Sequence, residues 1–367
     1  MSAMPPAADE TVAPLASALV RAGWSGSGRR VALPNGPASG SVTPFMDRRA
    51  FIGTVAGGLL APPLAAEAQQ AATSHRVGLL WPGGDPPPGH RMEWFRRGLR
   101  EAGYVEGQNL SLDVRHAEKA DRLHELANQL VRSNASVIVS FGDLGPQMAQ
   151  KATKTIPIVA LTDDFVGAGL VASLGRPEGN TTGVNILSPE LSAKRLSLLK
   201  EMLPSLSRVA DLWDPVNPTQ LKSTQNAALP LGVKIQVLEV RGREDVFKGF
   251  QAATKARAEA LTVFASPLLS SLQKSIRDLA ARYHLPAIYQ WREHAEEGGL
   301  MSYGPSLAEM WRQTALVTGK ILNGAKPTDL PIEQPTKFEL AINLKMAKAL
   351  GLTIPPSLLQ RTDQVIE

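Results

Sequence analysis

From residue 75 onward, short runs of aliphatic and β-branched residues alternate with stretches of helical period. The first series predicts strands at 76–81, 110–115, 136–141 and 156–161, separated by helices at 92–102, 121–133 and 147–154. Strands that alternate with helices favour a parallel sheet covered on both faces, because each helix carries the chain back to the start of the next strand. This segment therefore predicts an α/β lobe.

A second series of similar length begins after 180–186. It predicts helices at 189–203, 219–231, 244–257 and 270–283, and strands at 208–213, 234–240, 260–265 and 286–290. The remainder, from 300 onward, has no partner series, so we expect it to cross back and complete the first lobe. The sequence thus predicts two doubly wound, Rossmann-like lobes, made of 75–188 with 300–367 and of 189–299. Proline and glycine interrupt the pattern at 186–190, 290–300 and 326–338, where we place the hinge between the lobes.

The segment 46–68 has the parts of a secretory signal peptide. Arg48-Arg49 precede an uncharged stretch at 53–64, and Ala66-Glu67-Ala68 forms an A-x-A cleavage site before Gln69. The paired arginines fit the twin-arginine (Tat) variety. A buried Gly/Ala-rich helix is the alternative, but the glycines and prolines of this stretch disfavour it. We therefore expect a periplasmic protein whose signal is cleaved near Ala68.

Residues 1–45 precede that signal and show no sustained hydrophobic period. Their Ala, Pro, Gly and Ser content predicts no fold, because so little apolar burial cannot offset the entropy of ordering. Either they are a disordered arm, or they are an incorrectly assigned extension and the chain begins at Met46.

Composition narrows the function of the roughly 300 residues after the leader. The chain has no cysteine, which excludes disulfides, thiolate metal sites, a Cys nucleophile and a lipid-anchoring Cys. Its net charge of +5 is spread without Lys/Arg clusters, which argues against nucleic acid. No later apolar run reaches the length of a membrane span. We expect a monomer that is not membrane-embedded, with no cofactor and no metal.

Catalytic motifs are absent from the sequence: there is no G-x-S-x-G, H-E-x-x-H, P-loop or G-x-G-x-x-G after a strand. The loops after the predicted strands carry aromatic and polar groups instead, and ligands of open α/β sheets bind outside the carboxyl ends of the strands. Aromatic walls with a few oriented polar groups suit a small organic ligand. The residues expected to line the cleft between the lobes are Trp81, Phe141, Asp143, Asp163, Asp164, Asn217, Ser266 and Tyr289.

The pair Asp163-Asp164 leaves two roles open. Both residues directly follow the strand at 156–161, on the side of the cleft. Either could contact a ligand, or one could cap a helix that begins near Val166, a role that suits aspartate. A catalytic role is the weakest of the three alternatives.

Four gap-free stretches resemble the solute-binding proteins of an ABC-transporter family related to the tryptophan- and tyrosine-binding receptors. They are 169–184 (GLVASLGRPEGNTTGV), 298–304 (GGLMSYG), 330–340 (LPIEQPTKFEL) and 349–356 (ALGLTIPP), and the resemblance extends over nearly all of 75–367. It implies a type I periplasmic-binding fold whose two hinged lobes close on a solute. It also implies a small-molecule solute, an ABC permease and its ATPase as partners.

Two loops depart from that family. Asp163-Asp164-Phe165 stands where the family usually has Gly-Asp-Pro, and Gly142-Asp143-Leu144 stands in place of Gly-Thr-Pro. The identity of the ligand therefore does not follow from the aromatic amino-acid receptors. We expect a periplasmic solute-binding subunit of an ABC importer, with amino-acid-like or aromatic molecules as candidate ligands. An exported enzyme and a sensory ligand-binding subunit on the same fold are the alternatives.

Overall fold

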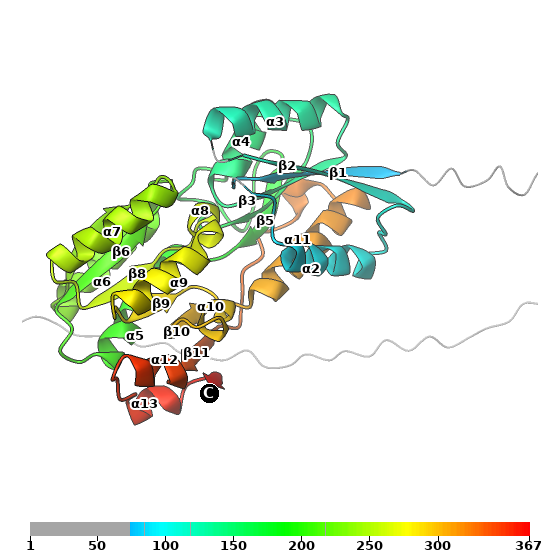
Figure 1. The fold of residues 1–367 in the computed structure, drawn as a ribbon. Helices are drawn as coiled ribbons and strands as arrows, with labels where there is room; N and C mark the ends of the chain where they lie inside the picture. Colours follow the sequence, from blue (N-terminus) through cyan, green and yellow to red (C-terminus); the bar gives the residue numbers. More distant parts are fainter. Residues whose placement is uncertain (1–73, 84, 118, 217) are drawn as a thin grey trace, which may run out of the picture. The chain divides into compact units, whose positions relative to one another are not determined.

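A computed structural model describes residues 74–367 except Gly84, Glu118 and Asn217 (Figure 1). The expectations for 1–45 and for the leader at 46–68 lie outside the described residues. Within the described part of the chain, no helix combines the length and the apolarity that crossing a membrane requires.

The first lobe is built on a five-stranded parallel sheet of order β2-β1-β3-β4-β5. Its strands are β1 (His75–Trp81), β2 (Leu110–His116), β3 (Val137–Phe141), β4 (Ile158–Thr162) and β5 (Thr181–Asn185). Its helices are α2 (Gly89–Glu101), α3 (Ala120–Arg132), α4 (Leu144–Ala152) and α11 (Leu307–Leu322). Figure 1 shows α2 and α11 side by side on one face and α3 and α4 on the other.

Helices cover both faces of this sheet, and successive side chains of a strand point to opposite faces. In β1, Val77, Leu79 and Trp81 pack into the cluster that contains the apolar residues of α2 and α11. Leu80 packs into the cluster of α3 and α4 on the opposite face. The two helix pairs therefore each cover one alternating set of strand residues.

The second lobe is built on a seven-stranded sheet of order β12-β11-β10-β9-β8-β6-β7. Its strands are β6 (Arg208–Trp213), β7 (Lys234–Glu239), β8 (Ala260–Val263), β9 (Ala287–Tyr289), β10 (Met301–Gly304), β11 (Glu339–Asn343) and β12 (Gln364–Ile366). Its helices are α5 (Ser188–Met202), α6 (Pro218–Leu231), α7 (Arg243–Lys255), α8 (Pro267–Ser271), α9 (Gln273–Arg282), α10 (Arg292–Glu296), α12 (Leu344–Ala349) and α13 (Pro356–Leu359). All pairs are parallel except β10 with β11.

The division of the last part of the chain differs from the one expected from the sequence. We expected 300–367 to complete the first lobe, but β10, β11 and β12 belong to the second sheet. The segment that returns to the first lobe contains α11, the short 3-10 helix η1 (Pro327–Asp329) and Glu333. Glu333 forms an isolated parallel β-bridge with Val184 of β5. Short apolar runs predict strands but do not indicate which sheet the strands join. The strands after residue 300 were therefore assigned to the wrong lobe.

Three segments connect the two lobes. The chain passes from β5 to α5, from β10 to α11, and from the η1 region to β11. The first and third fall within the hinge regions expected at 186–190 and 326–338. The hinge region expected at 290–300 instead contains α10 of the second lobe, and the remaining crossover lies directly after Gly304.

Candidate functional site

Three strands of the first lobe bring apolar side chains to one place. Trp81 ends β1, Phe141 ends β3 and Leu161 is the penultimate residue of β4. All three belong to the face covered by α2 and α11, because they continue the same alternating set of strand residues. Trp311 of α11 stacks on Phe141 with ring centroids 4.1 Å apart, and Trp81 meets Phe141 edge-on at 5.4 Å. The carboxyl ends of the strands thus form an aromatic wall.

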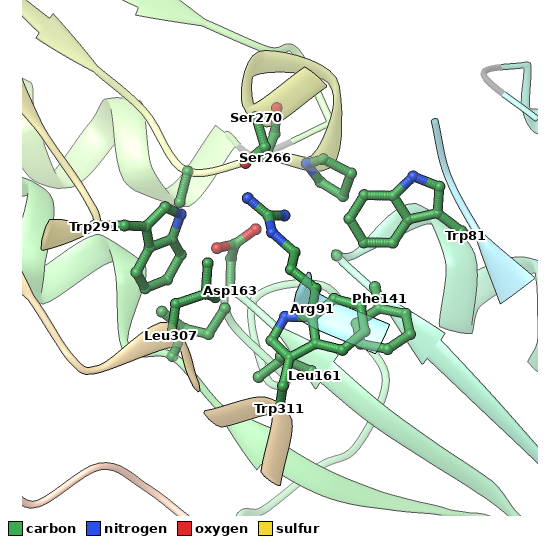
Figure 2. Close-up of a pocket in the computed structure, with 14 residues that line it drawn as sticks. Trp81, Arg91, Phe141, Leu161, Asp163, Ser266, Ser270, Trp291, Leu307 and Trp311 are labelled. Atoms are coloured by element: carbon green, nitrogen blue, oxygen red, sulfur yellow. The ribbon is translucent and has the colours of Figure 1, made fainter. Parts of the chain in front are cut away.

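The wall borders a cavity between the two lobes (Figure 2). The cavity contains about 370 Å³ of empty space, counting the part open to solvent. The first lobe contributes Trp81, Arg91, Phe141, Gly142, Leu161, Asp163, Ile186, Leu307 and Trp311. The second lobe contributes Ala265, Ser266, Pro267, Ser270 and Trp291.

Arg91, in the first turn of α2, directs a guanidinium into this cavity (Figure 2). The side chain is 7% exposed, and its Nε is buried without a hydrogen-bond partner. Its Cζ lies 6.0 Å from the centroid of the Trp81 ring. Burial lowers the pKa of Arg91 to about 10, and the charges of Glu293 and Glu297 act in the opposite direction. The group is therefore a buried cation at neutral pH.

Asp163 places a carboxylate in the same cavity, directly after β4. The hydroxyl of Ser188, the first residue of α5, donates to its Oδ1 at 2.6 Å. Arg195, two turns further along α5, is 1% exposed, and burial lowers its pKa to about 10 while the charge of Asp163 acts against that shift. The carboxylate is therefore balanced within the protein by α5.

Asp143 also lies between the lobes but faces a second cavity. The Thr162 hydroxyl and the Asp163 backbone N–H, the latter at 3.1 Å, donate to its Oδ1. Burial, and after it the charge of Asp163, raises the pKa of Asp143 well above the usual value. The second cavity is also lined by Asp214, Arg241 and Pro267, and Pro267 lines both cavities.

Asp164 lines neither of the two cavities. Its Oδ1 accepts a hydrogen bond of 2.9 Å from the backbone N–H of Gly167. A helix was expected to begin near Val166, but residues 165–169 form a turn. The Asp164 side chain stabilises this turn by accepting a hydrogen bond from its backbone. Asp164 thus hydrogen-bonds within a turn and does not cap a helix.

The remaining expected site residues have different positions. Ser266 lines the first cavity and caps α8, since its hydroxyl accepts from the backbone N–H of Leu269 at 3.0 Å. Tyr289 lies instead in the core of the second lobe, with its ring centroid 5.8 Å from that of His294. Its place in β9 directs it to the face covered by α7 and α9, away from the first cavity. Asn217 is outside the described residues.

Several lining residues were not expected from the sequence. Trp291 follows β9, at the end of a strand where the sequence predicted a cleft residue. The residue expected there to line the cleft was Tyr289. Trp311 and Leu307 lie on α11. The sequence assigned this segment to the first lobe but did not indicate which face of the helix points into the cavity. Arg91 gave no signal, because nothing in the sequence distinguishes it from the other arginines of α2. Its role follows only from the burial of its side chain.

Comparisons with known proteins agree with this architecture. The sequence pattern of the family described as ABC transporter substrate binding protein matches residues 90–366. A tyrosine-binding protein of Clostridioides difficile is 25% identical over 271 residues, which are 70% of this chain and 75% of that protein.

Two solved structures have similar folds over most of the chain. A conserved domain protein of Vibrio cholerae is 28% identical with a TM-score of 0.73, covering 80% of this chain and 99% of its own. A Streptococcus pneumoniae ABC domain in complex with L-Trp is 22% identical with a TM-score of 0.72, covering 80% of this chain and 100% of its own. The two-lobed α/β architecture is that of the type I periplasmic binding proteins. The chain therefore belongs to the ABC transporter substrate-binding protein family.

Proposed function

We propose that this protein is the periplasmic solute-binding subunit of an ABC importer and that it holds a small organic molecule between its lobes. The observation that carries the proposal is the cavity to which both lobes contribute. Its walls are Trp81, Phe141 and Trp311 from one lobe and Trp291 from the other. A solute held there contacts both lobes at once, so it favours the closed arrangement by its higher affinity for that state. A permease and its ATPase would recognise the closed form.

Amino acids and aromatic compounds are the first candidate ligands. Two relatives are described by name as binding tyrosine or as bound to L-Trp. The aromatic wall supports a flat ligand, because indole and phenyl faces stack on planar rings. Asp163 and Ser266 offer a carboxylate and a hydroxyl in the same cavity. The departures at Asp163-Asp164-Phe165 leave the choice within this class to experiment.

A thermal-shift screen tests the proposal. A solute present at 100 times its dissociation constant should stabilise the folded protein by about 2.7 kcal/mol. The screen should contain amino acids, aromatic acids, amines and neutral ring compounds. At least one class should raise the melting temperature in a concentration-dependent manner, and a panel without any such solute would contradict the proposal.

We also propose that the protein is exported with cleavage of 46–68. The support is the paired Arg48-Arg49, the apolar stretch and the A-x-A site in the sequence. N-terminal sequencing of the protein purified from its native host should begin near Gln69. Replacing Arg48 and Arg49 by lysine should retain the precursor in the cytoplasm, and export that continues undiminished would exclude the twin-arginine route.

A further inference from the structure

Arg91 is a buried cation without a counterion among the residues that the structure describes. No hydrogen bond or ion pair joins its guanidinium to any of them, although the side chain is 7% exposed and its Nε is fully enclosed. Removing a charge from water is costly unless it is paired and hydrogen-bonded. A guanidinium kept in this position inside an inter-lobe cavity is therefore suited to an anion that enters the cavity.

The acidic groups around the cavity are not ion-paired with this cation. Asp163 is hydrogen-bonded to Ser188 and balanced by the buried charge of Arg195. Asp143 faces the other cavity, and its carboxyl is surrounded by donors from Thr162 and Asp163.

The acidic residues of the adjacent helix α10 also leave Arg91 unpaired. Glu297 forms its ion pair with Arg277 at 2.5 Å. Glu293 is the carboxylate with the largest electrostatic effect on Arg91, yet it forms no ion pair with that side chain, and its own Oε2 is buried without a partner. Arg91 is therefore left without an ion-paired carboxylate among the described residues.

We propose that the cavity selects organic monocarboxylates with a flat apolar body and that Arg91 binds the carboxylate. This inference rests on the proposed function as a solute receptor, and it names the class of solute. The planar fork of a guanidinium matches a carboxylate with two parallel hydrogen bonds. The rings of Trp81, Phe141 and Trp291 surround the space beside it, where the body of the solute stacks (Figure 2). An amino group on the solute is not required.

Three indole compounds separate the contributions of carboxylate and amine. L-tryptophan carries both groups, indole-3-propionate only the carboxylate, and tryptamine only the amine. Titration calorimetry with the wild-type protein should detect both carboxylates and should find tryptamine at least about 100-fold weaker. Benzoate and phenylacetate extend the series to smaller bodies, in case the indole exceeds the space available.

Substitution of the arginine tests its role directly. Arg91→Met keeps a long apolar side chain but removes the charge, and it should weaken binding of the carboxylates about 30- to 1,000-fold. Arg91→Lys keeps the charge but lacks the planar fork, so its affinity for the carboxylates should lie between those of Arg91→Met and wild type. Arg96→Met is the matched control, because Arg96 lies on the same helix, pairs with Glu106 at 2.7 Å and does not line the cavity. It should leave affinity unchanged.

The outcomes distinguish this inference from the proposed function. The inference is overturned if tryptamine binds as tightly as the carboxylates, or if Arg91→Met retains wild-type affinity while its melting curve shows that it is folded. It is also overturned if no monocarboxylate binds but a neutral or cationic solute does, and in that case the solute-receptor function stands. If no solute of any charge binds, both proposals fail.

Discussion

Asp211 is a buried acid in the core of the second lobe. It lies in β6, is 0% exposed, and accepts a hydrogen bond from the hydroxyl of Thr262, its neighbour in β8. Its Oδ2 has no partner among the described residues. Burial raises the pKa of Asp211 from 3.8 to about 7, so the folded state holds a proton that the unfolded state releases between these values.

The pH dependence of stability should report this proton. Because the folded pKa is the higher one, the stabilisation by the neutral acid is complete below pH 4 and is lost as the pH rises to about 7. Asp211→Asn removes this dependence, since an amide oxygen can still accept from Thr262. The free energy of unfolding of the variant relative to wild type should therefore rise by about 1–4 kcal/mol between pH 4 and pH 8.

Urea unfolding across that pH range measures the difference. Asp278→Asn is the control, because Asp278 is exposed and its pKa is lowered by the hydrogen bond with Lys274. Its difference from wild type should not rise with pH. Parallel curves for Asp211→Asn and wild type would show that Asp211 is ionised in the folded protein.

Individual site residues were predictable as far as the ends of the strands. Trp81 and Phe141 were expected at the cleft because they end buried strands, and they line the inter-lobe cavity. Tyr289 ends a strand equally well, but it faces α7 and α9. Both faces of each sheet are apolar, so the sequence does not indicate which alternating set of residues continues into the cavity. Arg91 was missed because burial, not residue type, sets it apart.

Among the elements, the loop after β3 and the start of α8 meet across the two lobes. Gly142 has a φ of +62°, and a Cβ placed there would lie 2.7 Å from the Cγ of Pro267. Pro267 is the first residue of α8 and lines both inter-lobe cavities. Only glycine at position 142 lets the two elements approach this closely.

A double-mutant cycle tests whether this approach matters for closure. Gly142→Ala should weaken solute binding about tenfold or more, because the added methyl group holds the lobes apart. In a Pro267→Ala background the same change should cost much less affinity, since the ring atoms that it meets are gone. Calorimetric titration of the four proteins with one solute gives the coupling.

Backbone strain at the positive φ is the competing explanation of such a result, and it is the same in both backgrounds. Equal losses of affinity with and without Pro267 would therefore assign the effect to strain and exclude the contact. Gly103→Ala is a control, because Gly103 also has a positive φ of +89° but has open space around it and lies outside the cavity. It should lower stability without changing affinity.

Which element belongs to which lobe was only partly predictable. Helix α11 packs against α2 of the first lobe, to which the segment from 300 onward was assigned. The strands on either side of it join the second sheet, because β10 pairs with β9 and β11 pairs with β10. Their short apolar runs are compatible with either sheet, so only the pairing decides.

The molecule as a whole has contacts at its crossovers that connect the cavity to the hinge. Asp163 accepts from Ser188 at the point where β5 leads into α5. Further along that helix, Arg195 donates from Nε to the carbonyl of Tyr303 at 2.8 Å, beside the crossover after Gly304. Helix α5 therefore contacts two of the three connections between the lobes, and it also hydrogen-bonds to the cavity residue Asp163. A hinge of a few loop positions between rigid lobes fits this arrangement.

Small-angle X-ray scattering, with and without a solute identified by the thermal-shift screen, tests closure of the lobes on a solute most directly. We expect the radius of gyration to fall when the solute saturates the protein, because a molecule bound by both lobes favours the closed state. Addition of a compound that does not bind should leave the curve unchanged. A saturating solute that leaves the scattering curve unchanged would exclude closure on the solute, since binding would then not move the lobes relative to each other.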